Sequence, residues 1–310
     1  MARAPSLALA LALALAASSC ADARPSRSLA RLERLAFVPA GECLLGPRVT
    51  GIDCSNGRPL LVDRFEVTRA EWLDWQAGQA GAIDATLAAH SSEWRPETRA
   101  RPATWMNLFE ARAFAAAQGM RLPTAREWMH IAAGTRAQHW PWGPTAAQSV
   151  ANSLDLGLGR AAQVGTFERG RTTRGIHDLV GNVAEWVEGS LSPGVAPDLT
   201  WAAGGSFLTF QRELYRPDTS RPGGFDFNAQ LFDPHHRALD IGLRLVADAG
   251  RFLSAEARTW GAGARVRERL GAVGRSWGRS ALPLLEELCA AERAAPNLTA
   301  LLEGARQGAP

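Results

Sequence analysis

The part of the sequence that most limits what the chain can fold into is the stretch from residue 140 to 246. It is rich in glycine, proline, asparagine and aspartate, its apolar residues come in short runs, and it sustains no helical period. Such a composition interrupts long helices and favours short strands joined by loops. The sequence therefore predicts a loop-rich domain, and loops of this kind are where functional residues are expected.

Three short helices are predicted beside these loops, each from a Thr or Asn that stands three residues before a Glu. In this spacing the two side chains cap each other's backbone N–H groups at a helix start. A glycine follows each segment where a helix end is expected. Helices and strands together predict an α+β fold. The starting pairs are Thr68 with Glu71, Asn107 with Glu110, and Thr124 with Glu127, and the glycines are Gly78, Gly119 and Gly134.

The first 20 residues have the pattern of a secretory signal, with an arginine, an apolar run too short to span a membrane, and then small residues. The residues before Cys20 resemble a bacterial lipobox, although Ala17 stands where leucine is usual. We expect either lipidation of Cys20, which would anchor the chain to a membrane of the bacterial cell envelope, or ordinary signal cleavage. Both outcomes predict an exported protein, periplasmic or on the outer surface.

Export makes the cysteines informative. Cys43 and Cys54 flank a short segment rich in glycine, asparagine and aspartate, and an exported chain can keep such a pair as a disulfide. The alternative is two unrelated thiols in a loop. Cys289 stands alone in a leucine-rich segment, where a structural thiol is expected.

Arginine is the chain's basic residue throughout, and the sequence contains no lysine. This excludes Schiff-base chemistry on lysine and the lysine of a phosphate-binding P-loop. The 34 basic and 31 acidic residues nearly balance, and no long basic run is interleaved with aromatic residues. We therefore expect no nucleic-acid partner.

The composition also suggests where the domain begins and ends. Before Ala36 the sequence is polar, small and arginine-rich, which suits a tether. Beyond Asp248 it shifts to alanine, arginine, glutamate and leucine, with leucines at near-helical spacing, and such helices would pack on the domain or on a partner chain. The predicted parts are a signal peptide at 1–20, a tether at 21–35, a domain at 36–248 and a helical C-terminal extension at 249–310.

Five motifs in the predicted domain occur in a recognisable order and spacing. They are "GMRLPTAREWMHIAAG" at 119–134, "WPWG" at 140–143, "GIHDLVGNVAEWVEG" at 175–189, "GGSF" at 204–207 and "DIGLRLV" at 240–246. This arrangement resembles the formylglycine-generating enzyme family, also called the sulfatase-modifying factors, from about Phe37 to Asp248. The resemblance implies a loop-rich variant of the C-type lectin fold with bound calcium.

The resemblance does not extend to one catalytic feature. In the copper-dependent members of the family, two cysteines follow the Gly-Gly-Ser-aromatic motif, and here Thr209 and Leu214 stand at those positions. Thiolate sulfur is a soft ligand for Cu(I), and neither a hydroxyl nor an alkyl group replaces it. We expect no bound copper and no cysteine-dependent formylglycine formation, so no residue is assigned as catalytic.

The calcium ligands that the resemblance implies are the side chains of Asp178 and Glu185 with the carbonyl groups of Gly181 and Val183. Calcium prefers hard oxygen ligands of these kinds. Judged from the residues alone, Asp178 and Glu185 would be ordinary turn and surface acids, and that reading remains the alternative.

Two further sets of residues match family positions. Asn152 and the Ser153 carbonyl would belong to a second calcium site, although the loop that carries its remaining ligands is shortened here. Tyr215, Arg216 and Arg221 fall in the segment that lines the substrate groove of relatives. Arginine forks there could bind an acidic or peptide ligand, or they could be ordinary surface arginines.

A dense polar segment, "FDPHHRALD", precedes the last motif. Its residues His235 and His236, together with Asp233, could hold iron or zinc if a further ligand came from elsewhere. Adjacent histidines point different ways in an extended chain, so a polar surface loop is the alternative. Asp240 is better interpreted as part of the last motif.

Two functions follow from these observations. The missing cysteines favour a calcium-stabilised module of the cell envelope, a possible pseudoenzyme that binds an unknown peptide, protein or glycan. The alternative is a metal-dependent oxidase, with non-haem iron possible, that acts in the same groove. The superfamily also contains pyoverdine-maturation oxidases and ergothioneine-type sulfoxide synthases, and the latter take their histidine ligands largely from an additional helical domain.

Overall fold

The computed structural model describes residues 27–45, 52–78, 94–135, 140–143, 147, 149–189, 198–210, 216–218, 224–226, 229–291 and 295–309. The chain divides into two compact units. The larger unit is Arg34–Phe252, and the smaller unit is Leu253–Pro310 with the residues that precede Arg34. All five motifs of the family resemblance lie in the larger unit.

A three-stranded antiparallel sheet brings the two ends of the larger unit together. Its order is β1 (Leu35–Val38), β4 (Leu60–Asp63), β11 (Val246–Asp248). Val62 of β4 lies opposite Ala36 on one side and Val246 on the other. β1 and β4 are buried along their whole length, which agrees with their nearly continuous apolar sequences.

The second sheet contains the motif strand "AEWV" at its centre. Its order is β10 (Ile241–Gly242), β5 (Ala184–Val187), β6 (Thr200–Ala203), β9 (Gln230–Phe232), with β10 parallel to β5 and the other neighbours antiparallel. Two small antiparallel ribbons complete the described strands. They are β2 (Leu44–Leu45) with β3 (Ile52–Asp53), and β7 (Arg216–Asp218) with β8 (Gly224–Asp226).

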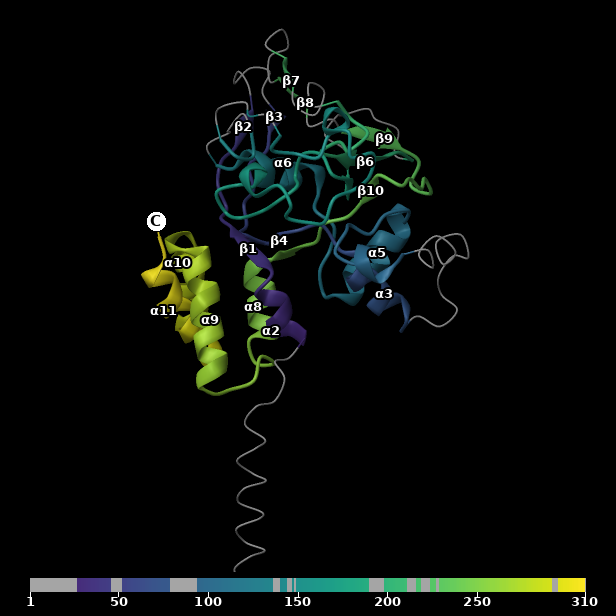
Figure 1. Cartoon of the computed structure of the whole chain (residues 1–310). Helices are drawn as coiled ribbons and strands as arrows, with labels where there is room; N and C mark the ends of the chain where they lie inside the picture. The colour runs from purple at the N-terminus through teal and green to yellow at the C-terminus, as the bar shows by residue number, and fades with distance from the viewer. Residues whose placement is uncertain are drawn as a thin grey trace, which may run out of the picture. The chain divides into compact units, whose positions relative to one another are not determined.

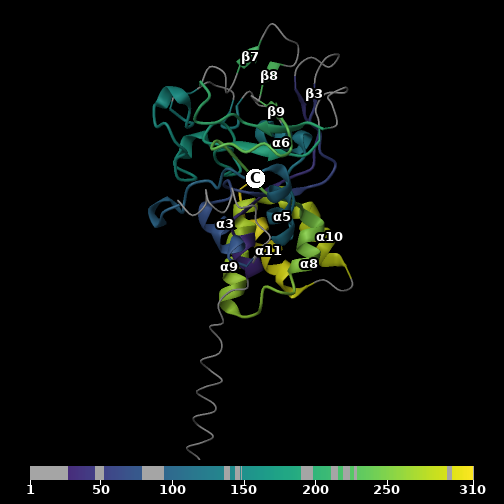
Figure 2. The same ribbon diagram turned by 90° about the vertical axis from the view of Figure 1, so that its right-hand side faces the viewer.

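The three capped helices form where the sequence predicts them. They are α3 (Arg69–Gln76), α5 (Leu108–Ala117) and α6 (Ala125–Ala133), and each begins with both hydrogen bonds of a capping box. Short 3-10 turns lie at Pro96–Thr98, Leu154–Leu156 and Glu168–Gly170. Both views place the β7–β8 ribbon at the end of the larger unit away from α3 (Figure 1, Figure 2).

The main core of the larger unit forms around α6. Trp128 and Met129 belong to one buried apolar cluster with Val62 of β4 and Ala203 of β6. His130 on the same helix is fully buried, and its two ring nitrogens lie 3.1 Å from backbone carbonyl oxygens, so it has a structural role. Short strands on either side of one buried helix hold a domain that is otherwise mostly loops.

A disulfide joins Cys43 to Cys54, with the two Cα atoms 4.9 Å apart. Both cysteines are buried, and the Cys54 N–H donates to the Cys43 carbonyl at 2.8 Å. The bridge links the segment that contains β2 to the one that contains β3. It therefore constrains the end of the loop between them.

The prediction of a tether over 21–35 is wrong from residue 27 onward. Helix α2 covers Arg27–Leu32 there, and β1 follows from Leu35. Leu29, Leu32 and Leu35 are fully buried. The arginines between these leucines made the segment look polar, but the three-residue spacing puts the leucines Leu29 and Leu32 on one helix face, which packs inward.

The smaller unit is helical, in agreement with the predicted C-terminal extension. Its described helices are α8 (Ala249–Glu256), which crosses the division between the units, α9 (Ala264–Trp277), the 3-10 turn Arg279–Ala281, α10 (Leu282–Ala290) and α11 (Pro296–Gln307). α9, α10 and α11 lie side by side (Figure 1). Among the described residues, none of the helices has both the length and the apolar composition that crossing a membrane requires.

Candidate functional site

Two of the sequence motifs meet in a buried ion pair between Arg244 and Glu185. Arg244 Nη2 donates to Glu185 Oε1 at 2.6 Å, and Arg244 Nε donates to both carboxylate oxygens at 3.0 and 3.1 Å. Trp128 Nε1 donates to Oε2 at 2.8 Å. The side chains of Arg244 and Glu185 are 0% and 1% exposed. Because both charges are buried, removing either residue would leave the other without its compensating charge.

Arg244 also holds two segments of backbone. Its Nη1 donates to the Asp63 carbonyl at 2.9 Å and its Nη2 to the His177 carbonyl at 2.7 Å. Burial alone would lower the pKa of this guanidinium, but the attraction of Glu185 keeps the pKa above its ordinary value. Arg244 is therefore a charged anchor that joins the end of β4 to the loop before β5.

Glu66 lies in the same buried region, and the sequence analysis did not single it out. Its carboxylate is fully buried and accepts from Asn182 Nδ2 at 2.8 Å and from the Val183 N–H at 3.2 Å. Burial, together with the nearby Asp178, raises the pKa of Glu66 well above its ordinary value. Its position between Phe65 and Val67, three residues beyond the end of β4, is the sequence signal that could have identified it, because an acid buried among apolar residues must be hydrogen-bonded.

Asp178 is the third buried acid of this region. It is 5% exposed, its backbone is left-handed with φ of 57°, and its Oδ2 accepts from the Gly165 N–H at 2.8 Å. Burial raises the pKa of Asp178 to about 6. Asp178 thus joins Glu66 and Glu185 as a buried carboxyl group close to the Arg244 guanidinium.

The residues expected to bind calcium fit the ion unequally. Asp178 has a carboxylate oxygen besides the one bonded to Gly165, but both oxygens of Glu185 already accept from Arg244, and one also accepts from Trp128. Glu185 therefore fits an internal ion pair better than a calcium site. Calcium bound by Asp178, Gly181, Val183 and Glu185 stays a prediction.

The position expected for a second calcium site contains an unsatisfied acceptor. Asn152 is fully buried, and its Nδ2 donates to the Arg160 carbonyl and to Asn182 Oδ1, each at 3.0 Å. Its Oδ1 has no hydrogen-bond partner among the described residues. A buried amide oxygen without a donor suits a cation or a water molecule. The Ser153 carbonyl accepts a single bond from the Leu156 N–H at 3.1 Å.

The Gly-Gly-Ser segment stabilises its own turn. Ser206 Oγ donates to Asp240 Oδ2 at 2.7 Å, which supports the structural interpretation of Asp240. Thr209 Oγ1 accepts from the Ser206 N–H at 3.1 Å, and its carbonyl accepts from Leu154. A Cβ at Gly204 would lie 2.6 Å from the Leu179 carbonyl, so only glycine fits this position. Thr209 thus closes a loop at the place of the first family cysteine.

The groove residues expected from the sequence are mostly outside the described part of the chain. Leu214, Tyr215 and Arg221 fall there, and Arg216 is described only as the first residue of β7. The structure therefore places none of their side chains.

The two adjacent histidines do not come together as metal ligands. The His235 ring lies against Phe109 with centroids 4.8 Å apart, whereas the His236 ring stacks on Phe232 at 4.7 Å. Asp233 Oδ1 accepts from the His235 N–H at 2.7 Å and so shapes the turn. Across the described residues no three His, Cys, Asp or Glu side chains form a group that could hold a metal ion. His235 and His236 as described do not fit an iron or zinc site.

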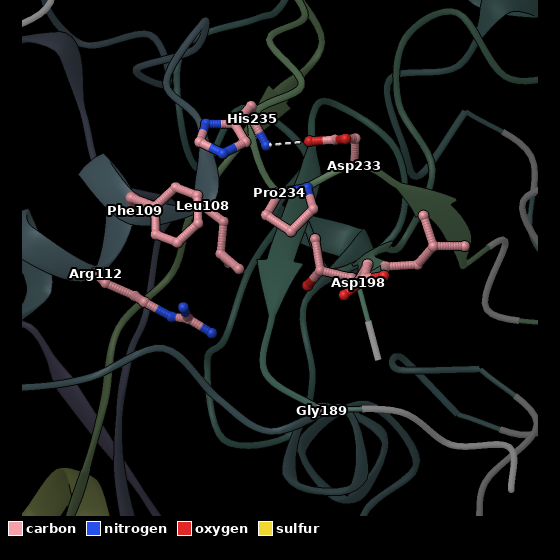
Figure 3. Close-up of a pocket in the computed structure, with 10 residues that line it drawn as sticks. Leu108, Phe109, Arg112, Gly189, Asp198, Asp233, Pro234 and His235 are labelled. Carbon is pink, nitrogen blue, oxygen red and sulfur yellow. Dashed lines mark hydrogen bonds between the residues drawn. The ribbon is translucent and has the colours of Figure 1, made fainter. Parts of the chain in front are cut away.

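A pocket of about 530 Å³ opens beside His235 in the larger unit (Figure 3). The N-terminal turn of α5 forms one wall, the segments after β5 and before β6 form a second, and the turn after β9 forms a third. Its volume is within the range of small-molecule sites. The lining residues are Leu108, Phe109, Arg112, Gly189, Asp198, Leu199, Thr200, Asp233, Pro234 and His235.

The pocket combines acidic groups with apolar walls. Arg112 Nε donates to Glu188 Oε1 at 2.6 Å, and this bond raises the pKa of Arg112 while neutralising its charge locally. The carboxylates of Asp198 and Asp233 then leave an excess of negative charge. Phe109 and Leu199 are 45% and 39% exposed and add apolar surface. Such a lining favours a small organic molecule with a positively charged group.

The sequence analysis missed most of this pocket. Phe109 and Arg112 stand three residues apart on α5, where helical spacing places them on one face, and an exposed aromatic residue beside a charge was a signal available from the sequence. Asp198 offered no such signal, because only the fold places it opposite the helix.

Comparison with protein families finds a match over residues 21–249 to the sulfatase-modifying factor enzyme 1-like domain. Similar curated proteins are named hercynine oxygenase. The one from Mycolicibacterium thermoresistibile is 32% identical over 161 residues, which are 43% of this chain and 36% of that protein. The one from Mycolicibacterium smegmatis is 30% identical over 193 residues, 48% of this chain and 45% of that protein. The matched part is less than half the length of these relatives.

Solved structures with the same fold include three that each cover 69% of this chain. Treponema denticola variable protein 1 superposes with a TM-score of 0.52 at 17% identity over 94% of its length. PvdO from Pseudomonas aeruginosa superposes with a TM-score of 0.50 at 22% identity over 94% of its length. CarF superposes with a TM-score of 0.50 at 19% identity over 97% of its length. The larger unit therefore has the α+β, C-type-lectin-like fold expected from the sequence, and identities this low carry no further conclusion.

Proposed function

This chain belongs to the family of sulfatase-modifying factor enzyme 1-like domains, and from that premise we propose that it works in an oxidative enzyme as the domain that binds and orients a small organic substrate. The observation that supports this most is the pocket beside α5, with its acidic and aromatic lining. The proposed substrate carries a positively charged group next to an apolar part.

Likeness to curated enzymes favours an oxidative role over a purely binding one. The relatives of about 30% identity are named as oxygenases. Since this chain spans less than half of their length, their whole activity is not transferred, and only the role of one domain in such a reaction is proposed.

In the proposed role the side chains of the pocket act on binding and orientation. Asp198 and Asp233 would attract the positive group of the substrate. Phe109 and Leu199 would cover its apolar part and exclude water. A metal ion, where present, would supply the oxidative chemistry, and the described histidines do not form a site for it.

A calcium-stabilised binding module of the cell envelope is the second candidate. It is favoured by Thr209, which stands at a family cysteine position and uses its hydroxyl to close a loop. Such a module would use the same pocket, or the groove near Arg216, to bind a peptide, protein or glycan without a reaction.

Metal content and oxygen consumption separate the two candidates. The protein is purified without chelators or an affinity metal, analysed for calcium, iron and copper, and assayed for oxygen uptake with added Fe(II), a thiol, and hercynine or simple amines. The oxidative role predicts oxygen uptake that depends on the substrate. Asp198→Asn and Asp233→Asn should each raise the substrate concentration that gives half-maximal uptake at least tenfold. Asp74→Asn, which changes an exposed acid paired with Arg99, is the control.

Calcium near one equivalent, with no oxygen uptake under any of these conditions, would reject the oxidative role and favour the binding module. Uptake that Asp198→Asn and Asp233→Asn leave unchanged would place the substrate outside the pocket.

A further inference from the structure

Two half-buried arginines of the larger unit, Arg69 and Arg101, lie on neighbouring segments. Arg69 is the first residue of α3, and Arg101 follows the 3-10 turn Pro96–Thr98. The Arg69 N–H donates to the Arg101 carbonyl at 2.9 Å, and the next N–H along the helix donates to the Arg99 carbonyl at 3.0 Å. These two bonds place Arg101 next to Arg69. Neither arginine lines the pocket beside α5.

The guanidinium group of Arg69 is held from two sides. Its Nε donates to the Pro102 carbonyl at 3.3 Å. Its Cζ lies 5.1 Å from the centroid of the ring of Trp94, a residue that is 9% exposed, and such a contact is attractive for a cation. Within the described ranges, the two Nη groups of Arg69 form no hydrogen bond. They can therefore donate to both oxygens of a bound anion.

The charges of the two arginines are not compensated. Among the residues that the structure describes, no carboxylate forms an ion pair with Arg69 or with Arg101, whereas Arg99 between them pairs with Asp74 at 3.1 Å. Burial and then repulsion from Arg101 lower the pKa of Arg69 to about 10. This repulsion means that the two positive charges lie within electrostatic reach of each other. Like charges at a half-buried position are costly unless an anion joins them.

The surroundings explain why Arg69 finds no partner of its own. Glu71, the acid nearest to it in sequence, accepts from the Thr68 N–H at 2.9 Å and pairs with Arg34 at 2.8 Å. The backbone donors at the start of α3 are also occupied, because the Glu71 N–H donates to Thr68 Oγ1 at 3.3 Å and the first two N–H groups bond to the neighbouring segment. An anion here would therefore be bound by the two arginine side chains rather than by the end of the helix.

We propose that Arg69 and Arg101 bind an oxyanion with two negative charges, such as a phosphate group, at the surface of the larger unit. Arg69 would supply a fork of paired hydrogen bonds, and Arg101 would supply the second positive charge. A dianion balances both charges, whereas a single carboxylate balances one. A free phosphate ion and a phosphate ester of a larger molecule share this chemistry. The site goes beyond the proposed function, because it does not depend on an oxidative role or on the pocket.

Titration calorimetry of the full chain with inorganic phosphate tests the proposal. Phosphate and acetate are compared at pH 7.5, with sodium chloride added to equal ionic strength. We expect saturable binding of about one phosphate per chain, with a rise in the unfolding temperature, and acetate should bind at least tenfold more weakly. No saturable phosphate binding would overturn the proposal. Acetate binding as tight as that of phosphate would contradict a site for a dianion.

Arg101→Gln is the informative variant, because no ion pair or side-chain hydrogen bond of Arg101 occurs in the described part of the chain, so its loss should not unfold the domain. We expect it to weaken phosphate binding at least tenfold. Arg169→Gln removes an exposed arginine of the turn Glu168–Gly170 and is the control for the same loss of charge. Equal phosphate affinity of these two variants would place the anion elsewhere and refute the site.

Arg69→Lys tests the fork separately from the charge. Lysine keeps the positive charge but cannot donate two parallel hydrogen bonds, so we expect phosphate to bind several-fold more weakly. The unfolding temperatures of all variants without phosphate show whether each is folded. Unchanged affinity in the folded Arg69→Lys variant would contradict binding through the Arg69 fork.

Phenyl phosphate, titrated in the same way, separates the two sources of the anion. Affinity equal to that of inorganic phosphate supports an ester group that reaches the site from a larger molecule. Binding of inorganic phosphate alone supports a site for the free ion.

Discussion

At the scale of single residues, the centre of the larger unit is an ion pair that two motifs build together. Arg244 and Glu185 are far apart in the sequence, and burying either charge would be costly without the other beside it. The surrounding hydrogen bonds from Trp128 and to two backbone carbonyls satisfy most of the remaining polar atoms. Arg244 therefore acts as a structural anchor between two segments of backbone.

Replacing Arg244 by Met should destabilise the domain strongly. The change keeps an apolar chain of similar length but leaves Glu185 buried without its positive partner, which typically costs about 3–5 kcal/mol. Urea unfolding followed by tryptophan fluorescence measures the loss. Arg126→Met, at an exposed ion pair, should change stability by less than about 0.5 kcal/mol. Equal effects of the two changes would contradict the anchoring role.

The buried acid Asp178 predicts a pH dependence of stability in calcium-free buffer. Its pKa is raised from 3.8 to about 6 in the folded state by burial. Between about pH 4 and pH 6 the folded chain therefore keeps this proton while the unfolded chain has lost it. Because the folded state binds more protons there, the free energy of unfolding should fall as the pH rises through this range. Asp178→Asn should flatten this part of the curve, measured by urea unfolding with a chelator present. A decrease of the same size in Asp178→Asn would assign the effect to another group.

At the scale of elements, helices α9 and α11 pack through glycines, although the leucine spacing was what indicated helices here. A Cβ at Gly274 would lie 2.1 Å from the Leu301 carbonyl, and one at Gly304 would lie 2.2 Å from the Gly271 carbonyl. The two backbones therefore touch. Leu270 of α9 and Leu301 of α11 are fully buried.

Alanine substitutions on α9 provide a test with a control on the same helix. Gly274→Ala places a methyl group against backbone that cannot move aside easily, and it should cost about 1–3 kcal/mol. Gly271→Ala meets nothing closer than 3.5 Å and should stabilise α9 by up to about 1 kcal/mol, because alanine is the better helix former. Thermal unfolding of both variants measures the difference, and two changes of the same sign would contradict this packing.

The disulfide between Cys43 and Cys54 should stabilise the larger unit. It closes a short loop, with a sequence separation of 11. A disulfide that closes a loop of this size stabilises the folded state by about 3 kcal/mol, because it restricts the unfolded chain. We expect the double change of both cysteines to Ser to lower the unfolding temperature, and a reducing agent to lower that of the unchanged chain in the same way. Cys289→Ser, at the free cysteine, should have little effect. Insensitivity to reduction would show that the bridge is dispensable.

At the scale of the whole molecule, the chain divides into two compact units. The larger unit has the fold of the family, and the matched region ends at residue 249, close to where this unit ends at Phe252. The smaller unit joins α2 near the N-terminus to the C-terminal helices. Ser28 Oγ of α2 donates to Glu256 Oε2 at 2.6 Å, and Trp260 Nε1 donates to Ser28 Oγ at 3.0 Å.

Because the larger unit has its own core, residues 34–252 produced alone should fold. We expect a single cooperative unfolding transition in calorimetry and a near-ultraviolet circular dichroism spectrum typical of packed tryptophans. The full chain is the reference, and size-exclusion chromatography of both shows whether the smaller unit governs association. An insoluble or non-cooperative 34–252 fragment would show that the larger unit depends on the helices it lacks.

Local patterns let the sequence predict whatever depends on neighbours along the chain. The three capping boxes, the helical C-terminal part and the loop-rich middle all rest on spacings of a few residues, and the motif order predicted the family and its fold. The prediction of a tether was wrong because the arginines made the segment look polar. The burial of Leu29 and Leu32 depends on residues far along the chain.

The candidate pocket was decided only by the tertiary structure. Asp198 and His235 lie at the same pocket as α5 because β6 and β9 pair in the second sheet. Composition sets how many charges a chain carries, but the energy of a charge depends on burial and on distance to other charges. Those quantities exist only after folding, so the sequence predicted the scaffold, and the folded chain decided which side chains could act together.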